Sequence, residues 1–222
     1  MGAAAGIGSG IIRGLTMLKL FMQNEFVIFT TRDYAAASRQ AVSAASRQLS
    51  RYAKEQAIVR LTKGVWANTQ HPYFTPLACV PYLLGNEQGY VSFLTALHLY
   101  GIVSQIPARY HVATTGHTRK LKTPVGQFDF ITLKPSLMRD GVVWSDTKLP
   151  YQIASPEKAL LDTLYISTRK QNRFAVLPEL DLSVSVFKEK TLMRLLKDFQ
   201  VSSRIKNAML TAWQSVRAIS IQ

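Results

Sequence analysis

Residues 29–67 read FTTRDYAAAS, RQAVSAASRQLSRYAKEQ and AIVRLTKGVWA, and this stretch decides the fold of the first third of the chain. Its pattern predicts two helices followed by a two-stranded β-hairpin, the arrangement of a winged helix-turn-helix. The second helix carries small and apolar residues on one side and Arg, Gln and Ser on the other. A soluble domain offers such a face to a nucleic-acid backbone more readily than to a metabolite.

The first helix of the pair is predicted over residues 31–37. The Thr30 hydroxyl can accept a hydrogen bond from the Asp33 amide, and the Asp33 carboxylate can bond back, as in a capping box. The acid also lies at the positive end of the helix dipole. Three successive alanines then let a second helix approach closely, which favours the positioning helix of a helix-turn-helix.

The second helix is predicted from Arg39 to about Lys54, with Ser38 as its N-cap. Between these two basic residues the chain has no acidic side chain. Ordinary exposed helices mix both signs, so this run favours a polyanionic partner over a merely solvated face. The inward-facing apolar stripe is expected to be Val42, Ala45, Leu49 and either Tyr52 or Ala53.

Two short β-runs, 58–61 and 65–67, surround a turn at Gly64, where glycine supplies the positive φ that a tight turn needs. Trp66 is expected to anchor this wing to the helices. Arg and Gln suit base edges and phosphates, and Ser suits phosphates. The residues expected to contact double-stranded DNA are Arg39, Gln40, Ser43, Ser46, Arg47, Arg51, Lys54, Arg60 and Lys63.

The predicted domains are a tail at 1–10, the winged helix-turn-helix at 11–69, a linker at 70–89 and a second domain at 90–222. Apolar residues at helical spacing predict a first helix over 11–24, followed by a short β-type run at 26–29. The linker contains two prolines between 70 and 76 and no periodicity.

The second domain is predicted to be a small α+β domain with C-terminal helices, so the whole chain is of the α+β class. A helix over 93–100, capped by Ser92 and ended by Gly101, opens it. Short strands are expected at 109–115, 118–122, 128–133, 142–144 and 149–154. Ser155-Pro156-Glu157 starts a helix that runs to about Ile166. Further helices are expected at 191–199 and 203–219.

Composition narrows the class of protein. The 27 Lys and Arg against 13 Asp and Glu give a formal net charge of +14, which favours DNA or RNA as a partner. The single Cys79 excludes an intrachain disulfide framework and a cysteine-cluster zinc site, and it fits a reducing compartment. The four histidines lack metal-ligand spacing, no apolar run is long enough to span a membrane, and no cofactor motif is present.

Two longer motifs carry a family resemblance. TTGHTRKLKTPVGQFDFITLKPSLM at 114–138, followed by IASPEKALLDTLY at 153–165, resembles the C-terminal domain of AbiEi-type antitoxins. YVSFLTALHLYGIVSQIP at 90–107 is similar to the helix that opens that domain, and residues 29–67 are similar to the family's DNA-binding domain. Together the similarity covers roughly residues 25–170.

The resemblance implies a bacterial cytoplasmic transcriptional repressor from a toxin–antitoxin or phage-defence operon. Members of this family typically bind inverted repeats upstream of their own operon. They oppose a nucleotidyltransferase-type toxin, commonly without a stable protein–protein complex, and the C-terminal domain is linked to neutralisation. Such a protein would bind its operator as a monomer or a dimer, and it would not be an enzyme.

Two other functions compete with this reading. Asp129 together with Asp146 and Lys148 resembles the acid and acid-x-Lys pattern of metal-dependent nucleases, which need two carboxylates for Mg²⁺ and a lysine near the phosphate. Alternatively, the winged helix is a protein- or RNA-binding adaptor.

Glu157 and Asp162 are five residues apart and share no helix face well, so they do not form a pair of catalytic carboxylates. Helix capping is expected for Glu157 and a buried hydrogen bond for Asp162.

Overall fold

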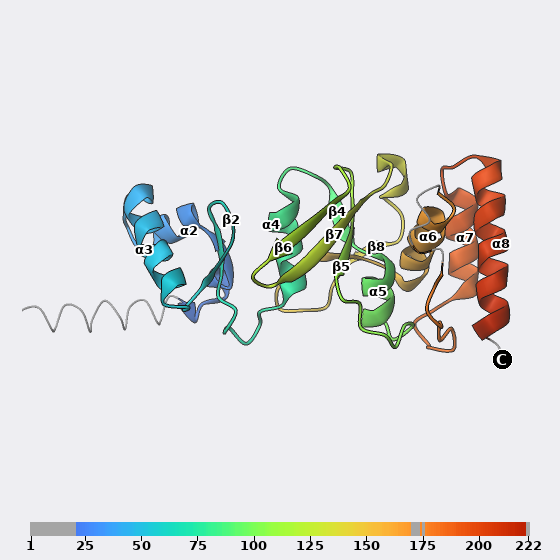
Figure 1. The fold of residues 1–222 in the computed structure, drawn as a ribbon, viewed down its shortest axis with the longest axis horizontal. Helices are drawn as coiled ribbons and strands as arrows, with labels where there is room; N and C mark the ends of the chain where they lie inside the picture. The colour runs from blue at the N-terminus through green and yellow to red at the C-terminus, as the bar shows by residue number, and fades with distance from the viewer. Residues whose placement is uncertain (1–20, 170–173, 175, 221–222) are drawn as a thin grey trace, which may run out of the picture. The chain divides into compact units, whose positions relative to one another are not determined.

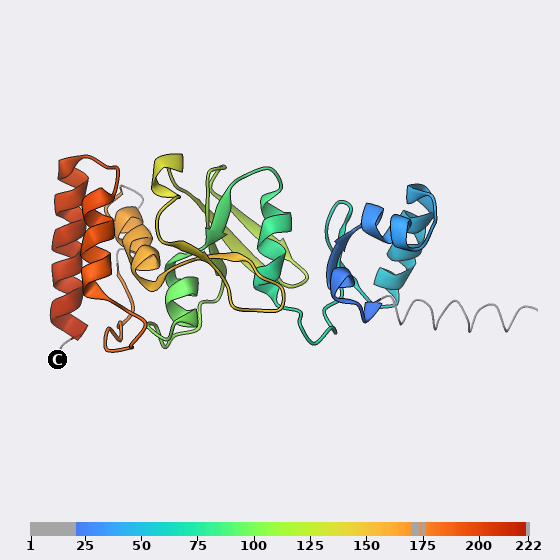
Figure 2. The ribbon, with the colours of Figure 1, turned by 180° about the vertical axis from the view of Figure 1, so that it is seen from behind.

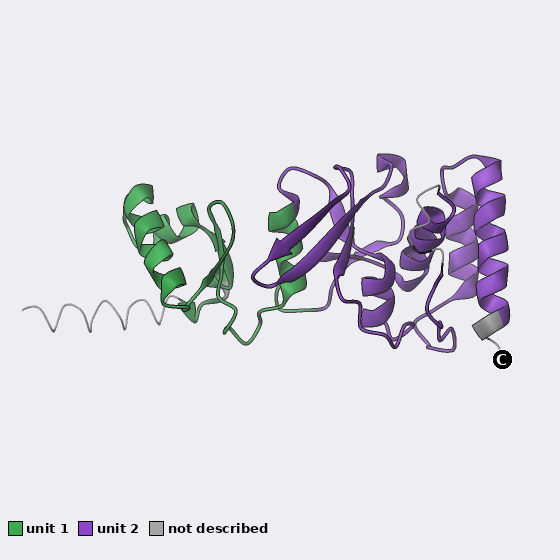
Figure 3. Cartoon of the chain, in the orientation of Figure 1, with its two compact units in different colours: residues 1–83, 147–149 green, residues 84–146, 150–222 purple. Residues whose placement is uncertain are grey.

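The chain is described by a computed structural model that covers residues 21–169, 174 and 176–220. It is a mixed α+β protein with a three-stranded and a six-stranded sheet (Figures 1 and 2). The chain divides into two compact units, one of residues 1–83 and 147–149 and the other of residues 84–146 and 150–222 (Figure 3). Among the described residues, no helix has both the length and the apolar character needed to cross a membrane.

The first unit contains one antiparallel sheet in strand order β1-β3-β2, together with short 3-10 helices and the α-helices α2, α3 and most of α4. In chain order its elements are η1 (Asn24–Phe26), β1 (Ile28–Thr30), α2 (Thr31–Ala37), α3 (Val42–Lys54), β2 (Val59–Thr62), β3 (Val65–Ala67), η2 (Pro76–Cys79) and α4 (Val80–Leu84). The boundaries predicted for α2 and β3 are confirmed. Residues 11–20 of the predicted first helix lie outside the described residues. The segment expected as a linker contains η2 and α4.

An aromatic core holds the first unit together. The rings of Phe29 and Tyr34 contact those of Phe21 and Phe26, and Tyr52 from α3 meets Tyr34 edge-on with ring centroids 6.5 Å apart. All five rings are at most 7% exposed. Edge-on and tilted contacts of this kind contribute beyond their buried area. They therefore fix α3 against β1 and α2.

The second unit is built on a mixed sheet in the order β6-β7-β5-β4-β9-β8. The strands are β4 (Gly89–Val91), β5 (Tyr110–Thr114), β6 (Arg119–Thr123), β7 (Gly126–Thr132), β8 (Val142–Trp144) and β9 (Gln152–Ala154). β5 runs parallel to β7 and β4 runs parallel to β9, whereas the other neighbours are antiparallel. The remaining elements are α5 (Phe93–Leu99), η3 (Pro135–Leu137), α6 (Pro156–Ser167), α7 (Glu189–Asp198) and α8 (Ser203–Ser220).

Buried polar side chains join α6 to β4 and to the start of α5. The carboxylate of Asp162, fully buried, accepts hydrogen bonds from Tyr90 Oη at 3.0 Å and Ser92 Oγ at 2.8 Å, and it forms an ion pair with Lys158. Lys158 Nζ also donates to Tyr90 Oη at 2.8 Å. The buried hydrogen bond expected for Asp162 is confirmed. The prediction that the Ser92 side chain caps α5 is wrong, because its hydroxyl donates to Asp162 and accepts no hydrogen bond from a helix amide.

The start of α6 matches its sequence signal. Ser155 Oγ accepts from the Lys158 amide at 3.3 Å, and Pro156 occupies the first turn. Glu157, 4% exposed, accepts from Ser155 Oγ at 3.0 Å and from the amide of Lys188 at 2.8 Å. Its carboxylate therefore fastens the segment before α7 to the beginning of α6, which is more than the capping role expected for it.

Candidate nucleic-acid interface

One face of α3 is apolar and buried, and the opposite face is polar and exposed. Ala45, Leu49 and Tyr52 point into the core of the first unit. With 3.6 residues per turn, residues spaced by four, seven and eleven positions share a face. The exposed side chains that recur at this spacing opposite the core are Ser43, Arg47, Ser50 and Lys54.

All nine side chains expected to contact DNA are exposed. Arg47 and Lys54 lie on the centre of the outward stripe of α3, and neither is ion-paired with any residue in the described part of the chain. Ser43 precedes Arg47 by one turn on the same stripe. The face thus presents uncompensated positive charge next to a hydroxyl group, which suits a phosphate backbone.

Arg51 lies at the side of this stripe and has an acidic neighbour. Its Nε is 3.9 Å from Glu55 Oε1, and the two side chains are 65% and 58% exposed. The Arg51 guanidinium is also 5.7 Å from the ring centroid of Tyr52. Exposed pairs of this kind are weak, so Glu55 reduces the charge of Arg51 only partly. The run without acidic residues ends at Lys54. The sequence analysis did not predict that Glu55, the next residue, lies beside Arg51.

The turn between α2 and α3 corrects the predicted helix start. α3 begins at Val42, with Ala41 as N-cap, and not at Arg39. Ser38 closes α2 instead, because its hydroxyl donates to the Tyr34 carbonyl at 2.6 Å. Val42 is 50% exposed, so its expected place in the core is also wrong. The helix begins late because residues 39 and 40 form the turn in which the chain reverses direction.

Arg39 holds the backbone conformation that makes this reversal. Its φ is +52°, its amide donates to the Ala36 carbonyl at 3.2 Å, and the amide of Gln40 donates to the Ala35 carbonyl at 2.9 Å. This pair of bonds defines a Schellman motif, in which glycine is the usual residue at the left-handed position. Arg39 therefore adopts a strained conformation, and both Arg39 and Gln40 are exposed in the turn beside the first residues of α3.

The β2–β3 turn is fastened to the start of α2. The Trp66 indole N–H donates to Thr31 Oγ1 at 2.9 Å, and the amide of Thr31 donates to the Gly64 carbonyl at 2.9 Å. Trp66 is 2% exposed, which confirms its expected anchoring role, and Gly64 has the expected positive φ of +78°. Lys63 is exposed at the turn itself, so its position is set by these bonds.

Two arginines outside α3 are exposed in the first unit. Arg60, on β2, is exposed, and its guanidinium lies 5.7 Å from the Trp66 ring centroid. Arg32, in the first turn of α2, is exposed as well and was missed by the sequence analysis. The capping box itself is confirmed, with Asp33 N donating to Thr30 Oγ1 at 3.2 Å and Thr30 N donating to Asp33 Oδ2 at 2.8 Å.

The two carboxylates of the alternative nuclease site do not come together. Asp129 lies on β7 and Asp146 follows β8, and three strands separate β7 from β8 in the sheet. At about 4.8 Å per strand, four spacings place β7 and β8 roughly 19 Å apart across the sheet, so side chains at these two strands are too far apart to share a metal ion. Asp129 Oδ1 instead accepts from Arg109 Nη1 at 3.4 Å. No group of three or more His, Cys, Asp and Glu side chains suited to a metal ion occurs within the described ranges.

Comparison of the chain with models of known protein families and with curated proteins gave no match. Any functional conclusion therefore depends on the residues and geometry of the chain itself, and on the motif resemblance noted in the sequence.

Proposed function

We propose that the first unit is a winged helix-turn-helix that binds double-stranded DNA, with α3 in the major groove and the β2–β3 turn against the flanking backbone. The observation that carries this proposal is the outward stripe of α3. Arg47 and Lys54 stand there without an acidic partner among the described residues, opposite a buried inner face. Basic side chains presented by a rigid helix are the usual means of contacting both base edges and phosphates.

The order of the elements supports the same proposal. A short strand, two helices and a hairpin follow one another as β1-α2-α3-β2-β3, and β3 lies between β1 and β2. In a winged helix-turn-helix the hairpin after the second helix joins such a strand to form the wing. Thr31 accepts a hydrogen bond from the Trp66 indole and donates one to the Gly64 carbonyl, and these bonds hold the turn of this hairpin next to α2, so helix and wing would move as one body.

The strain at Arg39 is a further, independent support. A residue with a Cβ costs roughly 1–2 kcal/mol in the left-handed conformation, and glycine avoids this cost. Strained backbone of this kind tends to persist at functional positions. An exposed arginine at the entrance of α3 is accounted for if its guanidinium contacts a phosphate when DNA is bound.

The wider role that we propose is that of a cytoplasmic repressor and antitoxin of a bacterial toxin–antitoxin or phage-defence operon. This part of the proposal is supported by the motifs at 114–138 and 153–165, which are similar to AbiEi-type antitoxins. The protein would bind operator repeats of its own operon, as a monomer or a dimer, without a cofactor. Its second unit would oppose a nucleotidyltransferase-type toxin.

DNA selection from a random duplex library, followed by fluorescence anisotropy on the enriched site, tests the DNA-binding proposal. The Arg47→Ala/Lys54→Ala double variant should lose most of the affinity, whereas Arg204→Ala, an exposed arginine at the start of α8, should retain it. Circular dichroism establishes that all three proteins are folded. A folded double variant that binds the selected site as tightly as the wild type would refute the assignment of α3.

The antitoxin role has a separate test. Co-expression with the nucleotidyltransferase gene adjacent to this one, where the operon contains it, should restore growth that the toxin alone prevents. The Arg47→Ala/Lys54→Ala variant should still restore growth from an unrelated promoter, because neutralisation is assigned to the second unit. Failure to restore growth would remove the antitoxin role and leave the DNA-binding proposal untouched.

A further inference from the structure

The strand β6 lies at one end of the six-stranded sheet, and β7 is its one strand neighbour in the described part of the chain. The two strands are joined by a two-residue turn, and Thr123 lies opposite Gly126 across it. The residues that flank such a turn share a backbone hydrogen bond, and bonded and non-bonded pairs then alternate along an antiparallel ladder. The backbone N–H and C=O groups of Lys120 and Lys122 therefore point away from β7. Neither residue forms a backbone hydrogen bond to a loop or turn of the described residues, so these groups form an open edge.

The same two lysines carry positive charge on one face of this edge. Residues two apart in a strand point to the same face, about 7 Å from one another along the strand. Both lysines are exposed, and neither forms an ion pair within the described ranges. Leu121, between them, belongs to the other face and is half-buried. Along its open edge β6 thus alternates a basic, an apolar and a basic side chain.

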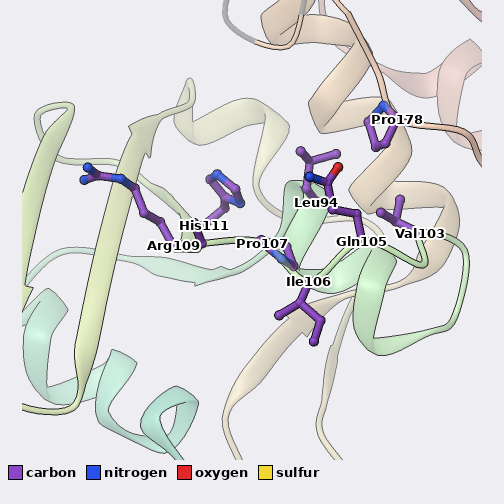
Figure 4. A pocket seen from close by; sticks show the side chains of 9 residues that line it. Leu94, Val103, Gln105, Ile106, Pro107, Arg109, His111 and Pro178 are labelled. Atoms are coloured by element: carbon purple, nitrogen blue, oxygen red, sulfur yellow. The ribbon is translucent and has the colours of Figure 1, made fainter.

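The acid opposite Lys120 is already paired with an arginine. Lys120 faces Asp129 of β7 in the sheet register, but Asp129 Oδ1 accepts from Arg109 Nη1 at 3.4 Å and its side chain is only 10% exposed. Arg109 borders a pocket of about 250 Å³, and its side chain extends away from the pocket residues Leu94 and Pro178, toward Asp129 (Figure 4). The charge of Asp129 is thus matched by Arg109, and the two lysines of β6 keep their charge for a partner.

A polypeptide strand fits this edge better than a nucleic acid does. The edge presents both backbone donors and backbone acceptors, and an added strand supplies partners for both, as in recognition by β-strand addition. A phosphate backbone would pair with the lysines but has no donor for the outward carbonyl groups. Lysines on an edge also deter strands that carry no opposite charge. The strand that adds here must therefore carry acidic side chains.

We propose that the open edge of β6 binds an extended acidic segment of a partner protein, added antiparallel to the six-stranded sheet. Acidic residues at alternate positions of the segment lie opposite Lys120 and Lys122, and an apolar residue between them covers Leu121. The opposite-charge pairs select the segment, and the backbone bonds hold it in register. The edge lies wholly in the second unit and uses none of the residues assigned to DNA, so this inference is independent of the proposed function.

Fluorescence anisotropy and ¹H–¹⁵N NMR on the full chain test the proposal with a labelled synthetic peptide of alternating glutamate and valine. The peptide should bind saturably, and the amides of Lys120 and Lys122 should show the largest shifts and slower hydrogen exchange. N-methylation of its glutamates, whose amides face β6, should weaken binding about tenfold, since backbone hydrogen bonds are lost. N-methylation of its valines, whose amides point away, should be tolerated. Equal loss from both methylated peptides would overturn strand addition.

Reversal of the charge on β6 tests the choice of an acidic segment. The Lys120→Glu/Lys122→Glu variant should bind the glutamate–valine peptide about tenfold more weakly, and it should bind a lysine–valine peptide that wild type does not bind. Lys190→Glu/Lys197→Glu makes the same change of net charge at two exposed positions of α7, and it should bind the acidic peptide as wild type does. No saturable binding at β6 by wild type, or unchanged binding by the β6 variant, would overturn the proposal.

A single-stranded oligothymidylate is the probe for the other class of polyanion. It should not displace the peptide from β6, because it has no donors for the outward carbonyl groups. If it does displace the peptide and shifts the amides of Lys120 and Lys122, the edge binds nucleic acid and the proposal is overturned.

Discussion

The indole N–H of Trp66 donates to Thr31 Oγ1 across 35 residues of sequence, at 2.9 Å and in a buried position. This bond joins β3 to the first residue of α2. Together with the bond from the Thr31 amide to the Gly64 carbonyl, it sets where the β2–β3 turn lies relative to the helices. A wing that contacts DNA together with α3 needs such a fixed position.

Replacing Trp66 with Phe should test the contribution of the indole to the anchoring of the wing. The phenyl ring is smaller than the indole, so the variant leaves a cavity and also removes the donor of Thr31 Oγ1, and the free energy of unfolding should fall by roughly 2–5 kcal/mol. Urea unfolding followed by circular dichroism measures the change. Trp144→Phe is the matched control, because Trp144 is 65% exposed and its replacement should change stability by less than about 0.5 kcal/mol. Equal effects of the two substitutions would contradict the anchoring role.

Replacing Arg39 with Gly should separate stability from DNA binding. Glycine relieves the left-handed strain at φ +52°, and part of this gain is offset by the greater freedom of glycine in the unfolded chain. The free energy of unfolding should therefore rise by roughly 0.5–1 kcal/mol. DNA affinity should fall at the same time, because a phosphate contact is lost. A more stable variant with unchanged affinity would show that Arg39 makes no contact.

The buried ion pair of Lys158 and Asp162 should be costly to break. Burial raises the pKa of the Asp162 carboxyl, and the hydrogen bonds from Lys158, Ser92 and Tyr90 oppose that rise. Lys158→Met leaves the acid without its cation and should destabilise the second unit by roughly 3–5 kcal/mol. Lys190→Met, at an exposed position of α7, should have almost no effect. Urea unfolding of both variants at pH 7 measures the difference.

Glu87 should make stability depend on pH in the acid range. Burial alone would raise the pKa of Glu87, but hydrogen bonds from Arg119 and Thr114 outweigh it and hold the pKa below its usual value. A carboxylate with a lowered folded-state pKa stabilises the fold above its unfolded pKa, and this stabilisation disappears as the pH falls through the folded value. Between pH 5 and pH 3 the melting temperature of wild type should therefore drop more steeply than that of Glu87→Gln. Parallel profiles would contradict this assignment.

Features that depend on residues close in sequence were predictable. The Thr30–Asp33 capping box and the Ser155 cap each join residues three positions apart, so the residue types alone specify them. Among the nine side chains expected to contact DNA, the exposure of those on α3 follows from helical periodicity, and that of Lys63 from its place in the hairpin turn. Two boundaries were wrong by three residues. The strand predicted at 149–154 begins only at Gln152. The helix predicted from Arg39 begins at Val42, because a left-handed arginine carries none of the Gly or Asn signal that normally marks the end of a helix.

Features that depend on distant residues were not predictable. Ser92 has the residue type and position of a helix cap, yet its hydroxyl donates a hydrogen bond to Asp162, which lies 70 residues further along the chain. Lys158 was expected only as part of an α6 motif, and its contact with Tyr90 spans 68 residues. The pocket beside Arg109 is formed by α5, β5 and Pro178, so no local pattern announces it. Such sites follow from the packing of elements and not from periodicity.

The salt dependence of DNA binding tests the central proposal most directly. For a selected duplex, log Kobs should fall linearly with log salt, and each phosphate contact should contribute about 0.9 to the slope. We predict that Arg47→Ala/Lys54→Ala reduces the slope of the wild type by up to about 1.8, while Arg204→Ala leaves it unchanged. A wild-type slope near zero, or the same slope in the double variant as in wild type, would contradict the assignment of α3 as the DNA-binding helix.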